Sequence, residues 1–125
     1  MILVDSCGWI EYFGEGPLAD QYAEFIEKTE KRQIVTPTIV VYEVYKKIKH
    51  RNGEEKALEA YAQISLTRVV ELTSSLSLKA ADISISTGVA MADAIVIATA
   101  NDYDAQILTS DQHFKNITKV KLISK

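Results

Sequence analysis

The chain has 125 residues, of which 47% are hydrophobic and 25% charged, a composition typical of a soluble globular protein with its own core. The single cysteine, Cys7, excludes an internal disulfide and suits a reducing, cytoplasmic compartment. The formal net charge of −3 does not by itself favour a nucleic-acid partner. We expect one domain over residues 1–125.

Two apolar stretches could be mistaken for a targeting segment or a membrane span. The run Met1–Val4 has no basic segment before it, so we expect no signal peptide. The stretch Ile83–Asn101 carries one charge, Asp93, and resembles a membrane span in hydropathy. A carboxylate at its centre would make insertion into a bilayer costly. We therefore interpret this stretch as buried protein interior and expect no membrane partner.

Strand-like and helix-like segments alternate along the chain. The apolar runs do not alternate with polar residues, which is typical of strands covered on both faces. In chain order the sequence predicts a strand Ile2–Asp5, a helix Pro17–Lys31, a strand Gln33–Thr36, helices Thr38–Arg51 and Glu54–Ser65, a strand Arg68–Leu72, helices Leu76–Thr87 and Met91–Tyr103, a strand Gln106–Thr109 and a weaker strand Val120–Ile123. This order predicts an α/β fold with a mainly parallel sheet and helices on both faces.

Four acidic residues follow the predicted strands. Asp5 closes the first strand, and Asp111 lies two residues past Thr109, where the fourth strand ends. Glu43 lies one turn into the helix after the second strand, and Asp93 opens the helix that leads to the fourth. Ligands of parallel sheets bind at the carboxyl ends of the strands. We therefore expect these four side chains to meet at one edge of the sheet.

Each aspartate also has a simpler interpretation as a helix cap. Asp5, Asp93 and Asp111 all precede helix-like segments, and aspartate is a preferred N-cap that stabilises a helix by about 1 kcal/mol. Capping explains Asp93 least well, because it is the one charge in an apolar stretch. A buried carboxylate is costly unless a cation or several donors accompany it.

Glu43 has a different alternative, an ordinary surface acid that pairs with Lys46 or Lys47. Its position argues against this, because Glu43 shares a helical stripe with Val40 and Val44 and so faces the sheet.

Four converging carboxylates require a positive partner. Two carboxylates about 5 Å apart repel by about 3 kcal/mol at an effective dielectric constant of about 20. A hard divalent cation, Mg²⁺ or Mn²⁺, is the expected partner for oxygen ligands, and no His/Cys set has the spacing of a zinc site. Neutralising the four charges would change the formal net charge from −3 to +1. A metal held in this way suits phosphodiester hydrolysis.

These segments resemble the PIN-domain ribonucleases and, within them, the VapC-type toxins of toxin–antitoxin pairs. The resemblance covers the whole chain, and four blocks in order carry it. They are Ile2–Ser6 with Trp9-Ile10, Thr36-Pro37-Thr38 with Glu43, Ala92-Asp93-Ala94 running into Ala98-Thr99-Ala100, and Leu108-Thr109-Ser110-Asp111 with Phe114.

The resemblance implies a three-layer α/β/α sandwich and a Mg²⁺- or Mn²⁺-dependent, single-strand-specific endoribonuclease. It implies a homodimer, an RNA substrate and an inhibiting antitoxin. The acids carry over as catalytic metal ligands, with two hydroxyl neighbours supporting them: Asp5, Glu43, Asp93 and Asp111, then Ser6 and Thr109. Trp9, Tyr12 and Phe13 could belong to the antitoxin docking surface, and plain core packing is the alternative for all three.

Other interpretations stay open. A non-toxin PIN nuclease of RNA maturation fits the same residues. A receiver-type signalling domain needs an acidic pair after its first strand, and this sequence lacks that pair. A purely binding role does not explain why four acids would gather. Cys7 and His113 permit a thiol-nucleophile interpretation, but a small buried cysteine and an exposed histidine are simpler. The basic run Lys46–Arg51 either leads an RNA backbone toward the metal or is a solvated helix face.

Overall fold

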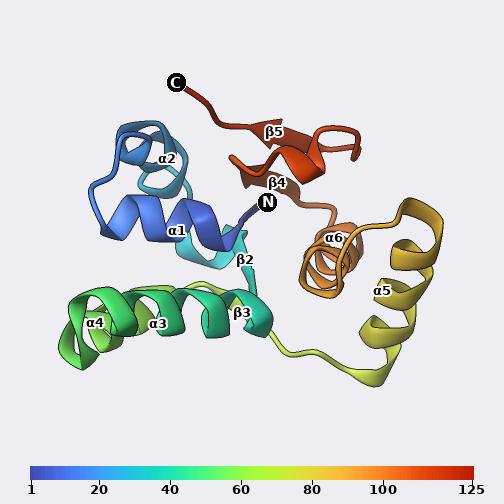
Figure 1. Ribbon diagram of the computed structural model, residues 1–125, viewed down its shortest axis with the longest axis horizontal. Helices are drawn as coiled ribbons and strands as arrows, with labels where there is room; N and C mark the ends of the chain where they lie inside the picture. Colours follow the sequence, from blue (N-terminus) through green and yellow to red (C-terminus); the bar gives the residue numbers. More distant parts are fainter.

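A five-stranded parallel sheet forms the middle of the molecule (Figure 1). The computed structural model describes residues 1–125. The strands are β1 Ile2–Val4, β2 Ile34–Pro37, β3 Arg68–Val70, β4 Gln106–Thr109 and β5 Val120–Leu122. The helices are α1 Ser6–Phe13, α2 Ala19–Ile26, α3 Thr38–Asn52, α4 Glu54–Ile64, α5 Ser74–Thr87 and α6 Met91–Tyr103, with short 3-10 helices η1 Lys31–Gln33 and η2 Gln112–Phe114.

The order of the strands, β3-β2-β1-β4-β5, explains how the helices are layered. The chain first runs outward from β1 to β2 and β3, and then crosses back to β4 on the other side of β1. Because crossovers between parallel strands are right-handed, the two directions place their helices on opposite faces. Figure 1 shows α1 to α4 on one side of the sheet and α5 and α6 on the other. The predicted three-layer α/β/α sandwich is confirmed.

The chain changes direction between β1 and β4, and doubly wound sheets bind ligands at the carboxyl ends of the strands at such a point. These two strands pair in register, Val4 with Leu108, so that the residues that follow them emerge side by side. The backbone N–H of Asp5 continues this pairing by donating to the carbonyl of Leu108 at 3.0 Å.

Most predicted elements agree with the structure to within two residues, but the helix Pro17–Lys31 was predicted too long. The observed helix α2 ends at Ile26, because residues 27–30 are Glu-Lys-Thr-Glu and offer nothing apolar to bury. The expectation that all strands are covered on both faces is also wrong at the edges. Val69 in β3 and Lys121 in β5 are exposed, since each edge strand has a neighbour on one side only.

Helix α6 is the buried element between the sheet and α5. Every residue from Ala94 to Ala100 is buried, and α5 packs on it through Leu76 and Ala80. The expectation of buried interior for Ile83–Asn101 holds for Ala94–Ala100 but is wrong for Ile85 on the outer side of α5 and for Met91 at the start of α6, which are 85% and 72% exposed. No single helix has the length and hydropathy to cross a membrane, and α5 with α6 meets those criteria only as a pair bent by 116°.

The three aromatic residues of α1 divide between core and surface. Trp9 is 1% exposed, and its ring stacks on Phe13 with centroids 5.6 Å apart. Tyr12 and Phe13 are half-buried and pack against the core from outside. Core packing is therefore correct for Trp9, and its proposed part in a docking surface was wrong, whereas Tyr12 and Phe13 remain accessible.

Gly8 allows α1 and α2 to approach closely below the carboxyl end of β1. A Cβ atom at this position would lie 2.5 Å from Cε1 of Tyr22 and 2.8 Å from Cγ1 of Val4. Only a residue without a side chain fits such an approach. The contact fixes the start of α1, and with it the direction of Asp5 and Cys7.

Candidate metal centre

Asp5 is the buried acid of the site. It directly follows β1 and caps α1, and its side chain is held from two sides, by the backbone N–H of Ser6 donating to Oδ1 at 2.8 Å and by the hydroxyl of Thr109 donating to Oδ2 at 2.9 Å. Asp5 is 6% exposed, and no lysine or arginine pairs with it. Capping is thus one role of Asp5, but its second oxygen points to Thr109 rather than to the helix.

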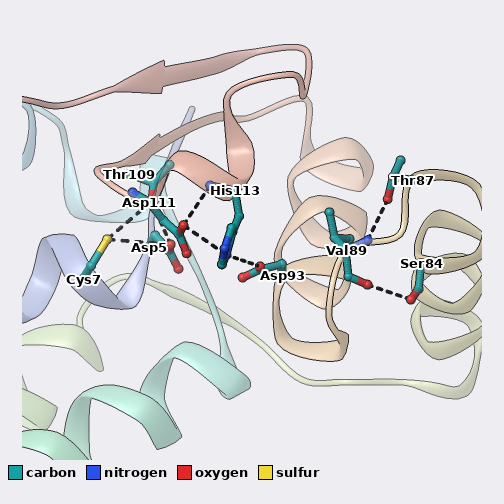
Figure 2. Close-up of polar contacts among 9 residues, drawn as sticks. All are labelled: Asp5, Cys7, Ser84, Thr87, Val89, Asp93, Thr109, Asp111 and His113. Atoms are coloured by element: carbon teal, nitrogen blue, oxygen red, sulfur yellow. Dashed lines mark hydrogen bonds and ion pairs between the residues drawn. The ribbon is translucent and has the colours of Figure 1, made fainter.

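Thr109 links Asp5 to the turn that carries Asp111. Its hydroxyl, fully buried at the end of β4, donates to Asp5 and accepts the backbone N–H of Asp111 at 3.0 Å. Asp111 then caps η2, because its Oδ1 accepts the backbone N–H of His113 at 2.9 Å. Figure 2 shows Asp5, Thr109 and Asp111 gathered in one group, with His113 beside them. The two strands therefore present two carboxylates at one point.

Asp93 approaches the same group from the first turn of α6. It is the third residue of α6, whose N-cap is Ala90, and its side chain makes no capping hydrogen bond. The capping alternative is therefore wrong for Asp93. Its Oδ2 instead lies 3.9 Å from Nδ1 of His113, and the ligand atoms of Asp93, Asp111 and His113 all lie within 4.8 Å of one another.

Glu43 reaches the site from α3. The residue is half-buried, and it forms no ion pair with Lys46 or Lys47, so the surface-acid alternative is wrong. Burial raises the pKa of Glu43, the Ser6 hydroxyl lowers it through a hydrogen bond, and the charges of Asp5 and Asp93 raise it further.

The electrostatics show that the cluster is strained without a cation. Burial is the main cause that raises the pKa of Asp5, and the charge of Asp111 adds to it, against hydrogen bonds that lower it. Burial also raises the pKa of Asp93, followed by the charges of Asp111 and Asp5. A raised pKa means that the charged form of each carboxylate is less stable here than in water, so the site disfavours the very charges that its sequence places there.

The donor set fits a divalent ion. Carboxylate oxygens of Asp93 and Asp111 converge with the imidazole of His113, and electrostatic coupling links Asp5 to Asp111 and Glu43 to Asp93. Asp5, the most buried carboxylate, has only hydroxyl, thiol and N–H neighbours to offset its charge. Hard cations such as Mg²⁺ and Mn²⁺ take this kind of oxygen set. A cation at this place would remove the repulsion that raises the pKa values of Asp5, Glu43 and Asp93.

The geometry also brings in residues to which the sequence assigned no role here. The thiol of Cys7 lies 3.8 Å from Oδ2 of Asp5 and 3.4 Å from the hydroxyls of Thr109 and Ser110, and it makes no hydrogen bond to His113. The thiol-nucleophile pair is therefore not assembled. His113 is 80% exposed, as expected, yet its ring faces two carboxylates. The one feature of the sequence that could have indicated this orientation is the position of His113, two residues after the capping Asp111.

The fold and the cluster together define the class of the protein, an α/β/α sandwich with an acidic centre at the carboxyl ends of its parallel strands. The family model of the PIN domain matches residues 2–120, so the chain belongs to the PIN domain family. This membership rules out the receiver-type interpretation. No curated protein matches the chain in sequence.

Several solved structures share the fold over nearly the whole chain. A toxin–antitoxin complex from Klebsiella pneumoniae is 20% identical with a TM-score of 0.80, covering 97% of this chain and 96% of its own. VapC20 of Mycobacterium tuberculosis, described as a sarcin-ricin loop cleaving toxin, is 18% identical with a TM-score of 0.82, covering 99% and 100%. FitAcB from Neisseria gonorrhoeae is 17% identical with a TM-score of 0.74, covering 99% and 97%.

Proposed function

We propose that the chain is a Mg²⁺- or Mn²⁺-dependent endoribonuclease that acts in the cytoplasm on single-stranded RNA. The observation that carries this proposal is the convergence of Asp93 and Asp111 with the buried Asp5, from segments far apart in the sequence. Like charges held together repel, and a cation bound between them offsets that repulsion. The RNA substrate and its single-stranded form rest on the resemblance to PIN-domain ribonucleases.

In this proposal the ion is held by four carboxylates, those of Asp5, Glu43, Asp93 and Asp111. When bound, it would lower the pKa of its water and stabilise charge on a phosphoryl oxygen. Thr109 keeps Asp5 in place through its buried hydroxyl, and we expect Ser6, which lowers the pKa of Glu43, to support that carboxylate. Hydroxyl donors of this kind fix the direction of the carboxylates before substrate arrives, which is how outer partners support metal ligands.

The test is RNA cleavage by the purified protein with Mn²⁺, with EDTA, and with the Asp93→Asn variant. We expect cleavage in the first condition and none in the other two. Cleavage that survives EDTA would contradict the metal mechanism.

The basic side of α3 is the proposed path of the RNA backbone. Lys46, Lys47, Lys49 and Arg51 are all exposed on the helix that also carries Glu43. Exposed lysines attract phosphates without reading sequence, and the contact weakens with salt. Tyr42, 57% exposed next to Glu43, offers a ring on which a base can stack.

We further propose that the nuclease is the toxin of a toxin–antitoxin pair. Structures of toxin–antitoxin complexes have the same fold over nearly their full length, which supports this role. Induced expression should arrest growth of the host, a co-expressed antitoxin should restore it, and Asp93→Asn should not arrest growth. If active enzyme leaves growth unchanged, a non-toxin PIN nuclease of RNA maturation becomes the better assignment.

A groove of about 660 Å³ between α1, α3 and α4 is the proposed docking place of the antitoxin. Ile10, Phe13 and Ile48 give it apolar walls, and its charged residues are two cations and two acids, Arg51, Lys56, Glu15 and Glu59. A groove of this kind accepts an apolar helix or strand whose charged groups pair with those of the walls.

Phe13→Ala should weaken antitoxin binding at least tenfold, because truncating an aromatic residue that anchors an interface costs about 2 kcal/mol or more. Titration calorimetry with the purified antitoxin measures it. Phe25→Ala is the matched control, since Phe25 is also half-buried against the core but does not line the groove. Equal losses in both variants would mean that the effect comes from core packing.

We also propose a homodimer that forms through the outer side of α5 and the start of α6. Leu78, Ile85 and Met91 are 70%, 85% and 72% exposed, a concentration of large apolar side chains that soluble surfaces rarely carry without a partner. Ile85→Glu should convert the protein to a monomer in light scattering. Leu66→Glu, at another exposed leucine, should leave the dimer intact.

A further inference from the structure

The imidazole of His113 lies between two carboxylates of the proposed metal centre. Its Nδ1 is 3.3 Å from Oδ1 of Asp111 and 3.9 Å from Oδ2 of Asp93 (Figure 2). The backbone N–H of His113 donates to Oδ1 of Asp111, which caps η2 and so fixes the turn on which the ring stands. His113 is also the one residue that forms an ion pair with either aspartate.

These separations are those of neighbouring ligands on one ion. Two adjacent ligands of an octahedral ion, each about 2.1 Å from it, lie about 3 Å apart. The contact to Asp111 is near that value, and the contact to Asp93 reaches it with a small rotation of two partly exposed side chains.

A nitrogen ligand changes which ion the centre prefers. Mg²⁺ takes oxygen ligands almost exclusively, whereas imidazole suits borderline transition ions, and affinity for nitrogen-containing sites rises along the first-row series from Mn²⁺. We propose that His113 is a nitrogen ligand of the centre and makes it bind Mn²⁺ in preference to Mg²⁺. This inference rests on the proposed function, because it concerns the same ion, but it can fail while metal-dependent cleavage remains.

A competing explanation is that His113 is only a cation that neutralises Asp93 and Asp111 until a metal displaces it. The two explanations predict opposite effects of removing the ring. Loss of a competing cation would tighten binding of Mn²⁺ and Mg²⁺ alike, whereas loss of a nitrogen ligand weakens Mn²⁺ selectively. The backbone N–H that donates to Oδ1 of Asp111 is present whatever side chain replaces that of His113, so these substitutions do not remove the turn.

The experiment measures dissociation constants for Mn²⁺ and Mg²⁺ by titration calorimetry and nitrogen coupling to bound Mn²⁺ by electron spin echo spectroscopy. For His113→Ala we expect Mn²⁺ affinity to fall at least about tenfold, Mg²⁺ affinity to change less than about threefold, and the ¹⁴N coupling to disappear. His113→Asp, which replaces nitrogen by oxygen, should restore tight binding and favour Mg²⁺.

The chain offers a matched control, because its only other histidine is His50, exposed on α3. His50→Ala should keep the nitrogen coupling and both affinities. Nitrogen coupling absent from the unsubstituted protein, or kept in His113→Ala, would overturn the inference, as would proportional changes in the two affinities. If neither ion binds the unsubstituted protein, the proposed function itself fails, and this outcome is distinct from the others.

Discussion

Asp93→Asn should reduce metal-dependent RNA cleavage by roughly a thousandfold and at the same time raise the thermal stability of the metal-free protein. Activity falls because a charged ligand of the proposed ion is lost. Stability rises because the substitution removes one of the charges that repel each other in the folded state, and Asp93 has no capping bond to lose. A single substitution therefore moves function and stability in opposite directions.

The size of the stability gain follows from the distances. The ligand atoms of Asp93 and Asp111 lie within 4.8 Å, where two full charges repel by about 3 kcal/mol at an effective dielectric constant of about 20. Their side chains are 20% and 36% exposed, so water screens part of this energy, and we expect a net gain of roughly 1 kcal/mol. For a domain of this size that raises the melting temperature by about 4 °C.

Asp102→Asn is the matched control, because Asp102 lies on the same helix but pairs with Lys79 away from the site. Cleavage should be unchanged, and stability should stay equal or fall slightly. If circular dichroism shows that Asp93→Asn unfolds the protein, the carboxylate has a structural role in α6, and the metal interpretation loses its main support.

The sequence predicts that Asp5, Asp93 and Asp111 approach one another, for a physical reason, while the joint binding of an ion by all four acids stays a prediction. Parallel strands joined by right-handed crossovers bring their carboxyl ends to one edge, so residues directly after strands converge even when their sequence positions are far apart. This rule alone predicts the placement of Asp5 and Asp111. Asp93 is predicted on a different ground, because a lone charge inside an apolar helix is costly, and the burial of most of α6 confirms that this helix lies in the interior.

The details that sequence did not give depend on side-chain direction and on exposure. His113 has a polar, exposed position, and only the turn capped by Asp111 aims its ring at the carboxylates. An isoleucine in an apolar stretch is expected in the core, but Ile85 is exposed because no element covers the outer face of α5. Trp9 and Phe13 lie on the same helix, and only packing on the sheet determines which of them is buried.

A second large effect is expected from the metal itself. Mn²⁺ at about one hundred times its dissociation constant should stabilise the fold by about 2.7 kcal/mol, which is about 10 °C in melting temperature, because it binds the folded chain only. This gain should depend steeply on pH. Differential scanning fluorimetry with and without Mn²⁺, from pH 5 to pH 7.5, measures both curves.

The sign of the pH dependence follows from the direction of the pKa shifts. Without metal, the pKa values of Asp5, Glu43 and Asp93 are raised above the ordinary values of 3.8, 4.5 and 3.8. The folded chain then holds protons more firmly than the unfolded chain, so these groups increase its stability as the pH falls from neutral toward 4. With metal bound, the same carboxylates are kept ionised, and stability decreases as the pH falls.

The two melting curves should therefore converge at low pH and separate toward neutral pH. Groups far from the site titrate equally in both samples, so they cancel in the difference between the curves and leave only the cluster. Asp93→Asn should flatten the metal-free curve, since one of the three raised groups is gone. A difference that is constant from pH 5 to pH 7.5 would mean that the ion is bound by groups other than these carboxylates, because displacing protons from them is what makes binding depend on pH.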